Sequence, residues 1–214
     1  MAKCRILLVR HGQSEGNLVR SFLGHTDLNL TELGHLQAEK TAEFLDSYDI
    51  DMLYASDLQR AWQTAEHIAN RKNLSIIADP TLREIYAGKW ENELFDVLPV
   101  KYPEDFSVWL NDIGNARCTG GESFVELYNR IIPEIQRIAK INDGLTVCIA
   151  THATPIRCIR LNAHGYGFDR AKDLGWTCNA SVTEIEVEDG KITIVNEHLY
   201  EHLGEIATGL PRNV

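Results

Sequence analysis

Short apolar runs alternate with segments of helical periodicity along most of this chain. The alternation extends from residue 3 to about residue 159 and implies a sheet that is covered by helices on both faces. Two further strand-like runs follow at 181–187 and 191–195, joined by the tight-turn pair Asp189-Gly190. This order predicts an α/β fold: a three-layer αβα sandwich with a mostly parallel central sheet and an antiparallel edge hairpin.

The composition fits one soluble domain, which we expect to span residues 1–214. Of the 214 residues 44% are hydrophobic, so the chain can bury a core without help from disulfides. No apolar run approaches the length of a membrane span, and the segment before the first strand is too short for a signal peptide. We therefore expect no membrane partner and a cytoplasmic location. The five cysteines form an odd set without a C-x-x-C pair and are expected to be reduced.

Arg10 and His11 stand where the first apolar run, Ile6 to Val9, stops. An open α/β sheet presents its chemistry at this end of its strands. A histidine beside a fixed cation could attack a phosphorus atom while the guanidinium holds the phosphoryl oxygens. By itself the Arg-His-Gly pattern favours a strand that ends in a solvated turn.

A second boundary follows the run from Asp51 to Ala55. Ser56 and Gln59 form an S-x-x-Q pattern, which predicts a capping box at the start of an amphipathic helix. Arg60 lies in the first turn of that helix, where free backbone N–H groups and the helix dipole favour anions. We therefore expect Arg60 to bind an anion, although a lone arginine there is also typical of an ordinary surface.

His152 follows a third apolar run, 145–150. Thr154 as the cap residue and Pro155 at the first helical position predict that a helix begins directly after it. His152 would thus lie in a strand-to-helix turn. A structural histidine that bonds to a backbone carbonyl would fit the same position.

Glu84 follows the strand-like run 74–78 through Pro80. Its carboxyl group would reach the same sheet edge as the residues above and could serve as a general acid. Because the ends of parallel strands meet at one edge, we expect five side chains to lie together, namely those of Arg10, His11, Arg60, Glu84 and His152.

These residues, in this order, resemble the histidine phosphatase superfamily, the phosphoglycerate mutase-like group, over nearly the whole chain. Five segments carry the resemblance: Arg10-His11-Gly12, Ser56-Asp57-Leu58 through Arg60, Leu82-Arg83-Glu84, Gly120-Gly121-Glu122-Ser123 and Thr151-His152-Ala153. Each is a modest pattern, and their occurrence in the family's order makes coincidence a poor explanation.

The resemblance implies a nucleophilic role for His11, which would form a phosphohistidine. Arg10, Arg60 and a protonated His152 would neutralise the phosphoryl oxygens. Glu84 would protonate the leaving oxygen and then accept a proton from the hydrolytic water. This scheme needs no metal and no cofactor.

Two more polar residues follow the nucleophile motif. By resemblance, the amide of Asn17 reaches the same phosphate, and Gln13 lies near enough to help orient it. Both are expected to bind phosphate together with Arg10, Arg60 and His152.

The family contains both phosphatases and mutases. By resemblance, phosphoglycerate mutases place an arginine directly after the acid and a tyrosine two residues beyond it, whereas this chain has Ile85 and Ala87. The segment 88–91, Gly-Lys-Trp-Glu, instead resembles the branch of ribazole phosphate and broad-specificity phosphatases. We expect a phosphatase that acts on small-molecule phosphate monoesters. A cofactor-dependent phosphoglycerate mutase is the alternative, and an inactive binding protein of the same fold is a remote one.

Residues 91–121 interrupt the regular alternation. They hold aromatic and apolar residues among prolines and acidic residues, namely Phe95, Leu98, Tyr102, Phe106 and Trp109. We expect a helical insertion over the active site. Its aromatic side chains would either form a wall against the leaving group or only pack the insertion onto the core, and both alternatives stay open.

The formal net charge of −10 argues against a nucleic-acid partner, which would need a basic face. A small phosphate ester needs only a local cluster of cations, such as Arg10, Arg60 and Arg83. The hairpin edge could pair with a second copy of the chain, so a homodimer stays open.

One motif points to different chemistry. Residues 198–202 match H-x-x-E-H, the zinc-binding pattern of inverted zinc peptidases. Such a site needs a third protein ligand, and Glu205 is the nearby candidate in the short tail that follows. A solvated tail is the favoured interpretation of this segment.

Overall fold

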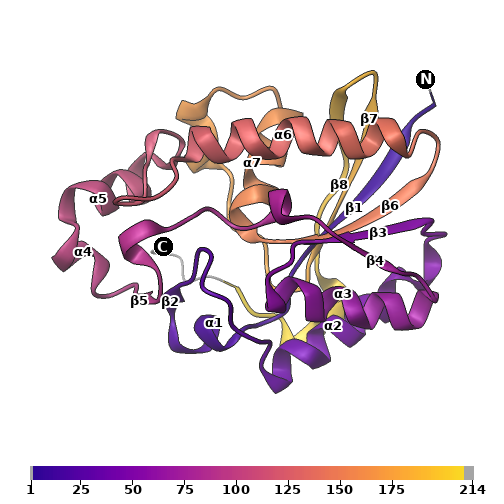
Figure 1. The fold of residues 1–214 in the computed structure, drawn as a ribbon, viewed down its shortest axis with the longest axis horizontal. Coiled ribbons are helices and arrows are strands. Elements are labelled where there is room, and N and C mark those ends of the chain that lie inside the picture. The colour runs from indigo at the N-terminus through magenta and orange to yellow at the C-terminus, as the bar shows by residue number, and fades with distance from the viewer. Residues whose placement is uncertain (1, 210–214) are drawn as a thin grey trace.

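A six-stranded sheet forms the centre of the described chain, residues 2–209 of a computed structural model (Figure 1). The strands are β1 (Cys4–Arg10), β3 (Met52–Ala55), β4 (Ile76–Ala78), β6 (Thr146–Thr151), β7 (Val182–Glu188) and β8 (Lys191–Leu199). Their order is β4-β3-β6-β1-β7-β8, with the first four parallel and β7 and β8 antiparallel to their neighbours. The mostly parallel sheet and the edge hairpin are confirmed, and β8 is four residues longer than predicted.

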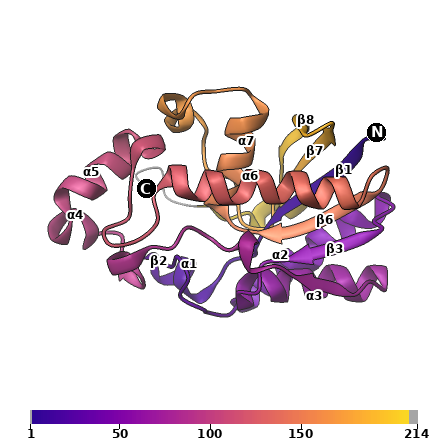
Figure 2. The same cartoon turned by 45° about the horizontal axis from the view of Figure 1, so that its top comes forward.

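Helices cover both faces of the sheet. α2 (Glu32–Phe44) and α3 (Gln59–Lys72) lie on one face, while α6 (Phe124–Ile141) and α7 (Ala153–Ala163) lie on the other, as Figure 2 shows. The three-layer αβα arrangement is therefore confirmed. Short 3-10 turns link the elements at Leu45–Ser47, Pro80–Leu82, Gly88–Trp90, Ile113–Asn115, Phe168–Asp173 and Glu201–Ile206.

The side chains of the central strands contribute to two separate hydrophobic cores. In β1, Ile6 and Leu8 join the larger core under α6 and α7, whereas Leu7 and Val9 join the core under α2 and α3. All four side chains are fully buried. Burial on both faces explains why these strands are continuous apolar runs without alternation.

Residues 91–121 form the expected helical insertion, which lies at the left in Figure 1. It contains β5 (Glu93–Leu94), α4 (Leu98–Lys101) and α5 (Pro103–Asn111). β5 pairs with β2 (Ser21–Phe22), which follows α1 (Glu15–Val19), so the insertion is joined to the segment after the nucleophile motif.

The start of α7 differs from the prediction. The helix begins at Ala153, with His152 as the extended residue before it, two residues earlier than the expected cap at Thr154. Pro155 is therefore the third helical residue, where the missing N–H is tolerated because it has no partner within the helix. The consequence is that His152 stands directly at the helix N-terminus.

The start of α3 differs as well. Leu58 is the extended residue before the helix and makes no side-chain cap, so the predicted Ser56–Gln59 capping box is wrong. The Ser56 hydroxyl instead accepts a hydrogen bond from the Leu58 amide at 3.4 Å and lies against His152.

The C-terminal motif is also placed differently from the expectation. His198 accepts a hydrogen bond from the Cys178 amide, while His202 lies 3.0 Å from the Thr41 hydroxyl and stacks on Phe44. Nowhere in residues 2–209 do three or more His, Cys, Asp or Glu side chains gather as metal ligands. The tail packs on α2 through Leu203, which is 3% exposed, so the solvated-tail expectation is wrong.

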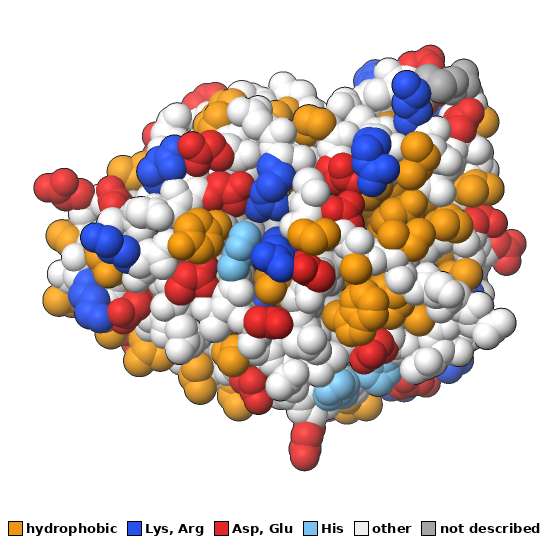
Figure 3. Space-filling model, viewed as in Figure 1, with side chains coloured by type: hydrophobic (Ala, Val, Ile, Leu, Met, Phe, Trp, Pro, Cys, Tyr) orange, Lys and Arg blue, Asp and Glu red, His pale blue; other side chains and the backbone are white. Residues whose placement is uncertain are grey.

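Three further observations concern the charged surface, the cysteines and the length of the apolar helices. On the face seen in Figure 3, Lys and Arg side chains are interspersed with Asp and Glu side chains. The five cysteines are free thiols, three of them fully buried, namely Cys118, Cys148 and Cys158. Within the described chain, no helix is both long enough and apolar enough to cross a membrane.

Candidate active site

A cavity opens where the parallel strands end. Arg10 and His11 reach it from the end of β1, Arg60 from the first turn of α3, and Glu84 from the loop after β4. Sequence analysis predicted this convergence, and the structure places these four side chains around one hollow. His152 lies directly behind His11, with ring centroids 5.2 Å apart and the rings edge to face.

The His11 imidazole is held in one orientation. Its Nδ1 lies 2.7 Å from the Gly12 carbonyl oxygen, which can only accept, so Nδ1 carries the proton. Nε2 therefore has the free lone pair that nucleophilic attack requires. Burial first, and the Arg60 and Arg10 cations next, lower the pKa of His11 well below its usual value, so the ring is neutral at physiological pH.

Gly12 allows the backbone to pass close to the first turn of α2. A Cβ atom at this position would lie 2.4 Å from the carbonyl oxygen of Gly34, which is too close for any side chain. The Gly12 amide donates to the Thr64 hydroxyl at 3.0 Å. Glycine thus serves close approach here, and it keeps the Gly12 carbonyl in position for His11.

Two guanidinium groups are buried at the cavity. Arg10 and Arg60 are each 1% exposed, and burial lowers the pKa of both to about 10, so both stay charged at neutral pH. Arg60 donates to the carbonyls of Gly24 and Thr26 at 2.8 and 2.9 Å, and Arg10 donates to the Thr177 carbonyl. Their Nε atoms have no partner among the described residues, which leaves donors and positive charge for an anion.

His152 is fully buried and contacts the Ser56 hydroxyl through Nε2 at 2.8 Å. Nδ1 has no hydrogen-bond partner in residues 2–209. Burial and the nearby Arg60 cation lower the pKa of His152 well below its usual value. The His152 ring is therefore neutral in this structure, whereas the resemblance implies a protonated His152.

The Glu84 carboxylate is anchored by backbone amides. One oxygen accepts from the Ile85 N–H at 2.9 Å, and the other accepts from the Thr154 N–H, at the start of α7, at 3.3 Å. Glu84 is only partly buried and lines the cavity, so its carboxyl group can meet both a bound ester and water.

Asn17 lines the cavity, whereas Gln13 does not. The Asn17 side-chain oxygen accepts from Ser14 and from Asn179, so its NH2 group is the part available to an anion in the cavity. The Gln13 side-chain oxygen accepts from the Thr31 hydroxyl at 2.9 Å, and Gln13 is not part of the cavity lining. Only Asn17 keeps a geometry suited to phosphate.

Asn179 is a site residue that sequence analysis missed. It is 1% exposed, and its NH2 group donates to the His11 carbonyl at 3.2 Å and to Asn17 at 3.1 Å. It lies in the loop before β7, far along the sequence from both partners. No local pattern marks an asparagine for this role, because its value comes only from the contacts that the fold creates.

The insertion contributes part of the cavity wall. Phe95 and Trp109 line the cavity, whereas Phe106 is buried in the core behind it. Trp109 also stacks on Trp176, with centroids 6.1 Å apart and an interplanar angle of 22°. Some of the aromatic residues therefore line the cavity and others only pack in the core, and Trp176, from the loop before β7, is a lining residue that sequence analysis did not predict.

Arg83 does not join the cation cluster. Its guanidinium binds both carboxylate oxygens of Asp57 at 2.6 and 2.5 Å, outside the cavity lining. The cluster predicted from three arginines therefore contains two.

We expect the His11 ring to remain neutral at about pH 6, because burial and two cations disfavour a further positive charge. The depressed pKa would keep the Nε2 lone pair free as the pH falls through 6.5. Long-range 1H–15N NMR correlations should show an Nδ1-protonated neutral ring, with His11→Ala for assignment. A titration midpoint near 6.5 would contradict the prediction.

Comparison with known proteins extends these observations. A model of the histidine phosphatase superfamily (branch 1) matches residues 6–198. Phosphoserine phosphatase 1 of Hydrogenobacter thermophilus is 34% identical over 202 residues, covering 94% of this chain and 95% of that protein. Phosphoglycerate mutase-like protein 4 of Arabidopsis thaliana is 31% identical over 188 residues, covering 86% and 80%. A solved mycobacterial glucosyl-3-phosphoglycerate phosphatase has a TM-score of 0.83 at 25% identity, covering 92% of this chain and 100% of that one.

Proposed function

The chain belongs to the histidine phosphatase superfamily, and we propose that it hydrolyses small-molecule phosphate monoesters through a phosphohistidine at His11. The observation that carries this proposal is the orientation of the His11 ring. Its Nδ1–H donates a hydrogen bond to the Gly12 carbonyl, which leaves the Nε2 lone pair at a cavity that contains two buried guanidinium groups. Similarity to two proteins named as phosphatases supports the same reaction class.

In the first step, the Nε2 lone pair of His11 forms a bond to phosphorus while the bond to the leaving oxygen breaks. Glu84, as a carboxylic acid, gives its proton to that oxygen. Arg10 and Arg60 stabilise the charge on the equatorial phosphoryl oxygens, and their burial strengthens this effect because little water screens it. The Gly12 carbonyl continues to accept from Nδ1, which stabilises the positive charge that the ring acquires.

In the second step, water attacks phosphorus and the bond to Nε2 breaks. Glu84, now a carboxylate, takes the proton of the attacking water. A bound phosphate dianion also changes the environment of His152, since it brings negative charge to a neutral ring flanked by cations. We propose that His152 takes up a proton with the phosphate and donates to it, and that Asn17 adds its NH2 group. These steps require no metal ion.

A mutase is the second candidate, because one relative is named as mutase-like. The structure favours the phosphatase instead. By resemblance, mutases of the family have an arginine and a tyrosine where this chain has Ile85 and Ala87. Both residues are fully buried in the core with Leu82. Neither position can present a polar group to a substrate carboxylate in the cavity. Phe95, Trp109 and Trp176 line the cavity, and we propose that they contact the leaving group.

The test is phosphate release from a panel of monoesters with EDTA present. The panel contains O-phosphoserine, a sugar phosphate and 4-nitrophenyl phosphate, and a parallel assay follows isomerisation of 3-phosphoglycerate primed with 2,3-bisphosphoglycerate. We expect chelator-resistant hydrolysis that outruns isomerisation. Faster isomerisation would establish the mutase, and no turnover of either kind would favour an inactive binding protein.

A further inference from the structure

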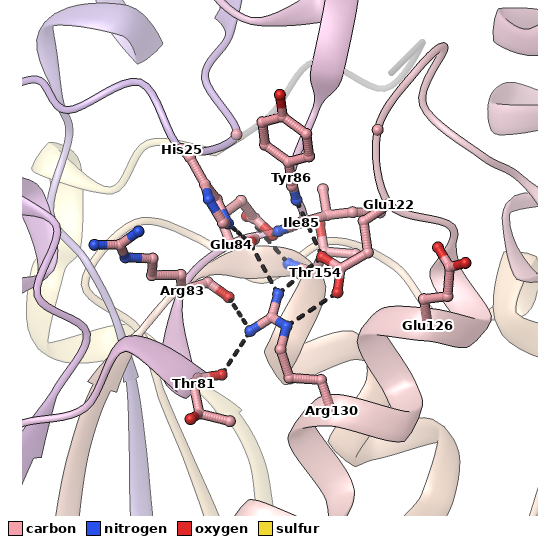
Figure 4. Close-up of polar contacts among 12 residues, drawn as sticks. His25, Thr81, Arg83, Glu84, Ile85, Tyr86, Glu122, Glu126, Arg130 and Thr154 are labelled. Carbon is pink, nitrogen blue, oxygen red and sulfur yellow. Dashed lines mark hydrogen bonds and ion pairs between the residues drawn. The ribbon is translucent and has the colours of Figure 1, made fainter.

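Arg130 of α6 lies behind the loop that carries Glu84 and binds three of its backbone carbonyls (Figure 4). Nη1 donates to the carbonyl of Thr81 at 2.5 Å and to that of Arg83 at 3.1 Å. Nη2 donates to the carbonyl of Glu84 itself at 3.1 Å. One guanidinium thus binds backbone carbonyls both just before the candidate acid and at the acid itself.

The remaining N–H groups of Arg130 bind Glu122. Nε donates to one carboxylate oxygen at 3.0 Å, and Nη2 donates to the other at 2.9 Å. A guanidinium has five N–H donors, and Arg130 has five acceptors, so each donor has a partner. The side chains of Arg130 and Glu122 are 24% and 14% exposed, so solvent screens this pair less than a surface pair.

Glu122 binds the backbone of Tyr86, which follows Glu84 by two residues. Its carboxylate accepts from the Tyr86 amide at 3.1 Å, and its own amide donates to the Tyr86 carbonyl at 2.8 Å. His25 approaches from the opposite side, with Nε2 2.9 Å from the Glu84 carbonyl oxygen (Figure 4). The backbone of Glu84 is therefore held before, at and after the residue.

These contacts replace regular secondary structure. Residues 83–87 lie in neither a helix nor a strand, so no helical or sheet ladder fixes the acid in place. A general acid acts only when its proton lies within hydrogen-bond reach of the leaving oxygen, and displacements near 1 Å are costly. Something outside the loop must supply the rigidity.

We propose that Arg130 and Glu122 are positioning residues that fix Glu84 for proton transfer to the leaving group. The inference rests on the proposed phosphatase reaction, in which Glu84 is the acid. It assigns a functional reason to the glutamate of the Gly120-Gly121-Glu122-Ser123 segment, which otherwise lies outside the cavity lining. Neither residue touches the substrate.

The proposal predicts a dependence on the leaving group. A nitrophenolate leaves without a proton, whereas an alkoxide needs one, so a displaced acid harms alkyl phosphates most. The test compares kcat/KM of wild type and Arg130→Lys for 4-nitrophenyl, phenyl and alkyl phosphates. This parameter covers only the steps up to the phosphohistidine. We expect losses of about 10- to 100-fold for the alkyl ester and below ~3-fold for the nitrophenyl ester.

Glu122→Gln is the second variant, because it keeps the side-chain shape but loses an acceptor for Arg130 and Tyr86. This variant should likewise lower kcat/KM more for the alkyl ester than for the nitrophenyl ester. Arg71→Lys is the matched control, since Arg71 also binds both carboxylate oxygens of an acidic residue through Nε and Nη2, here Asp46 in the turn after α2, away from the acid. It should leave the dependence unchanged.

Two results would overturn the proposal: an equal loss across the ester series, which a merely structural role would cause, or no loss in either variant. Failure of the proposed function looks different. If Glu84→Gln itself leaves the leaving-group dependence unchanged, Glu84 is not the acid, and if His11→Ala retains hydrolysis, the nucleophile is assigned wrongly. Circular dichroism and thermal melting of each variant establish that the compared proteins are folded.

Discussion

Replacing His11 by alanine should reduce the turnover of phosphate monoesters by about 10⁴-fold or more, because it removes the Nε2 lone pair that the proposal assigns to the covalent intermediate. The His11 ring is neutral, has its Nδ1 proton bound to Gly12 and presents Nε2 at the cavity. Steady-state phosphate release measures the loss. Wild-type protein mixed with a labelled monoester and quenched in alkaline denaturant should also carry the label on residue 11, and the variant should carry none.

His202→Ala is the matched control for this experiment. His202 is a partly buried histidine that stacks on Phe44, contacts Thr41 and is not part of the cavity lining. Its removal should leave turnover within about 3-fold of wild type. Substantial hydrolysis by His11→Ala, or label found on His152, would show that the nucleophile is another residue.

Replacing Arg60 by alanine should lower kcat/KM by about 10³-fold, since a buried guanidinium that stabilises a transferring phosphoryl group is among the larger contributions to such reactions. Arg60→Lys should lose about 10- to 100-fold, because lysine cannot bind the carbonyls of Gly24 and Thr26 and the phosphate with one planar fork. The measurement is steady-state kinetics over a range of ester concentrations, with binding of inorganic phosphate as a second readout.

Arg83→Lys is the control for Arg60. Arg83 is the neighbouring arginine whose guanidinium pairs with Asp57 outside the cavity, and its side chain is 35% exposed. The change should cost less than about 3-fold in kcat/KM. Equal effects of Arg60→Lys and Arg83→Lys would contradict the assignment of Arg60 as the phosphate ligand, because they would show that the loss does not depend on the position of the guanidinium at the cavity.

Local patterns in the sequence were sufficient for the layers of the fold. The buried strands are continuous apolar runs, and each must be covered on both faces, so helices on both sides follow directly. Helix starts were harder to predict. At Ser56 the hydroxyl contacts His152 and makes no cap, and Thr154 makes none because it already lies inside the helix, where Glu84 accepts from its backbone N–H.

The sequence by itself determined which chemical groups stand at the ends of the strands: Arg10, His11, Arg60, Glu84 and His152. Parallel strands bring their ends to one edge, so that convergence needs no knowledge of side-chain packing. Tertiary structure alone decided the protonation of the two histidines, since burial and neighbouring cations lower their pKa values. It also decided that Arg83 pairs with Asp57, that Asn179 supports His11, and that Arg130 holds the acid loop. Each of these depends on partners that are distant in the chain, and a local sequence pattern carries no information about such contacts.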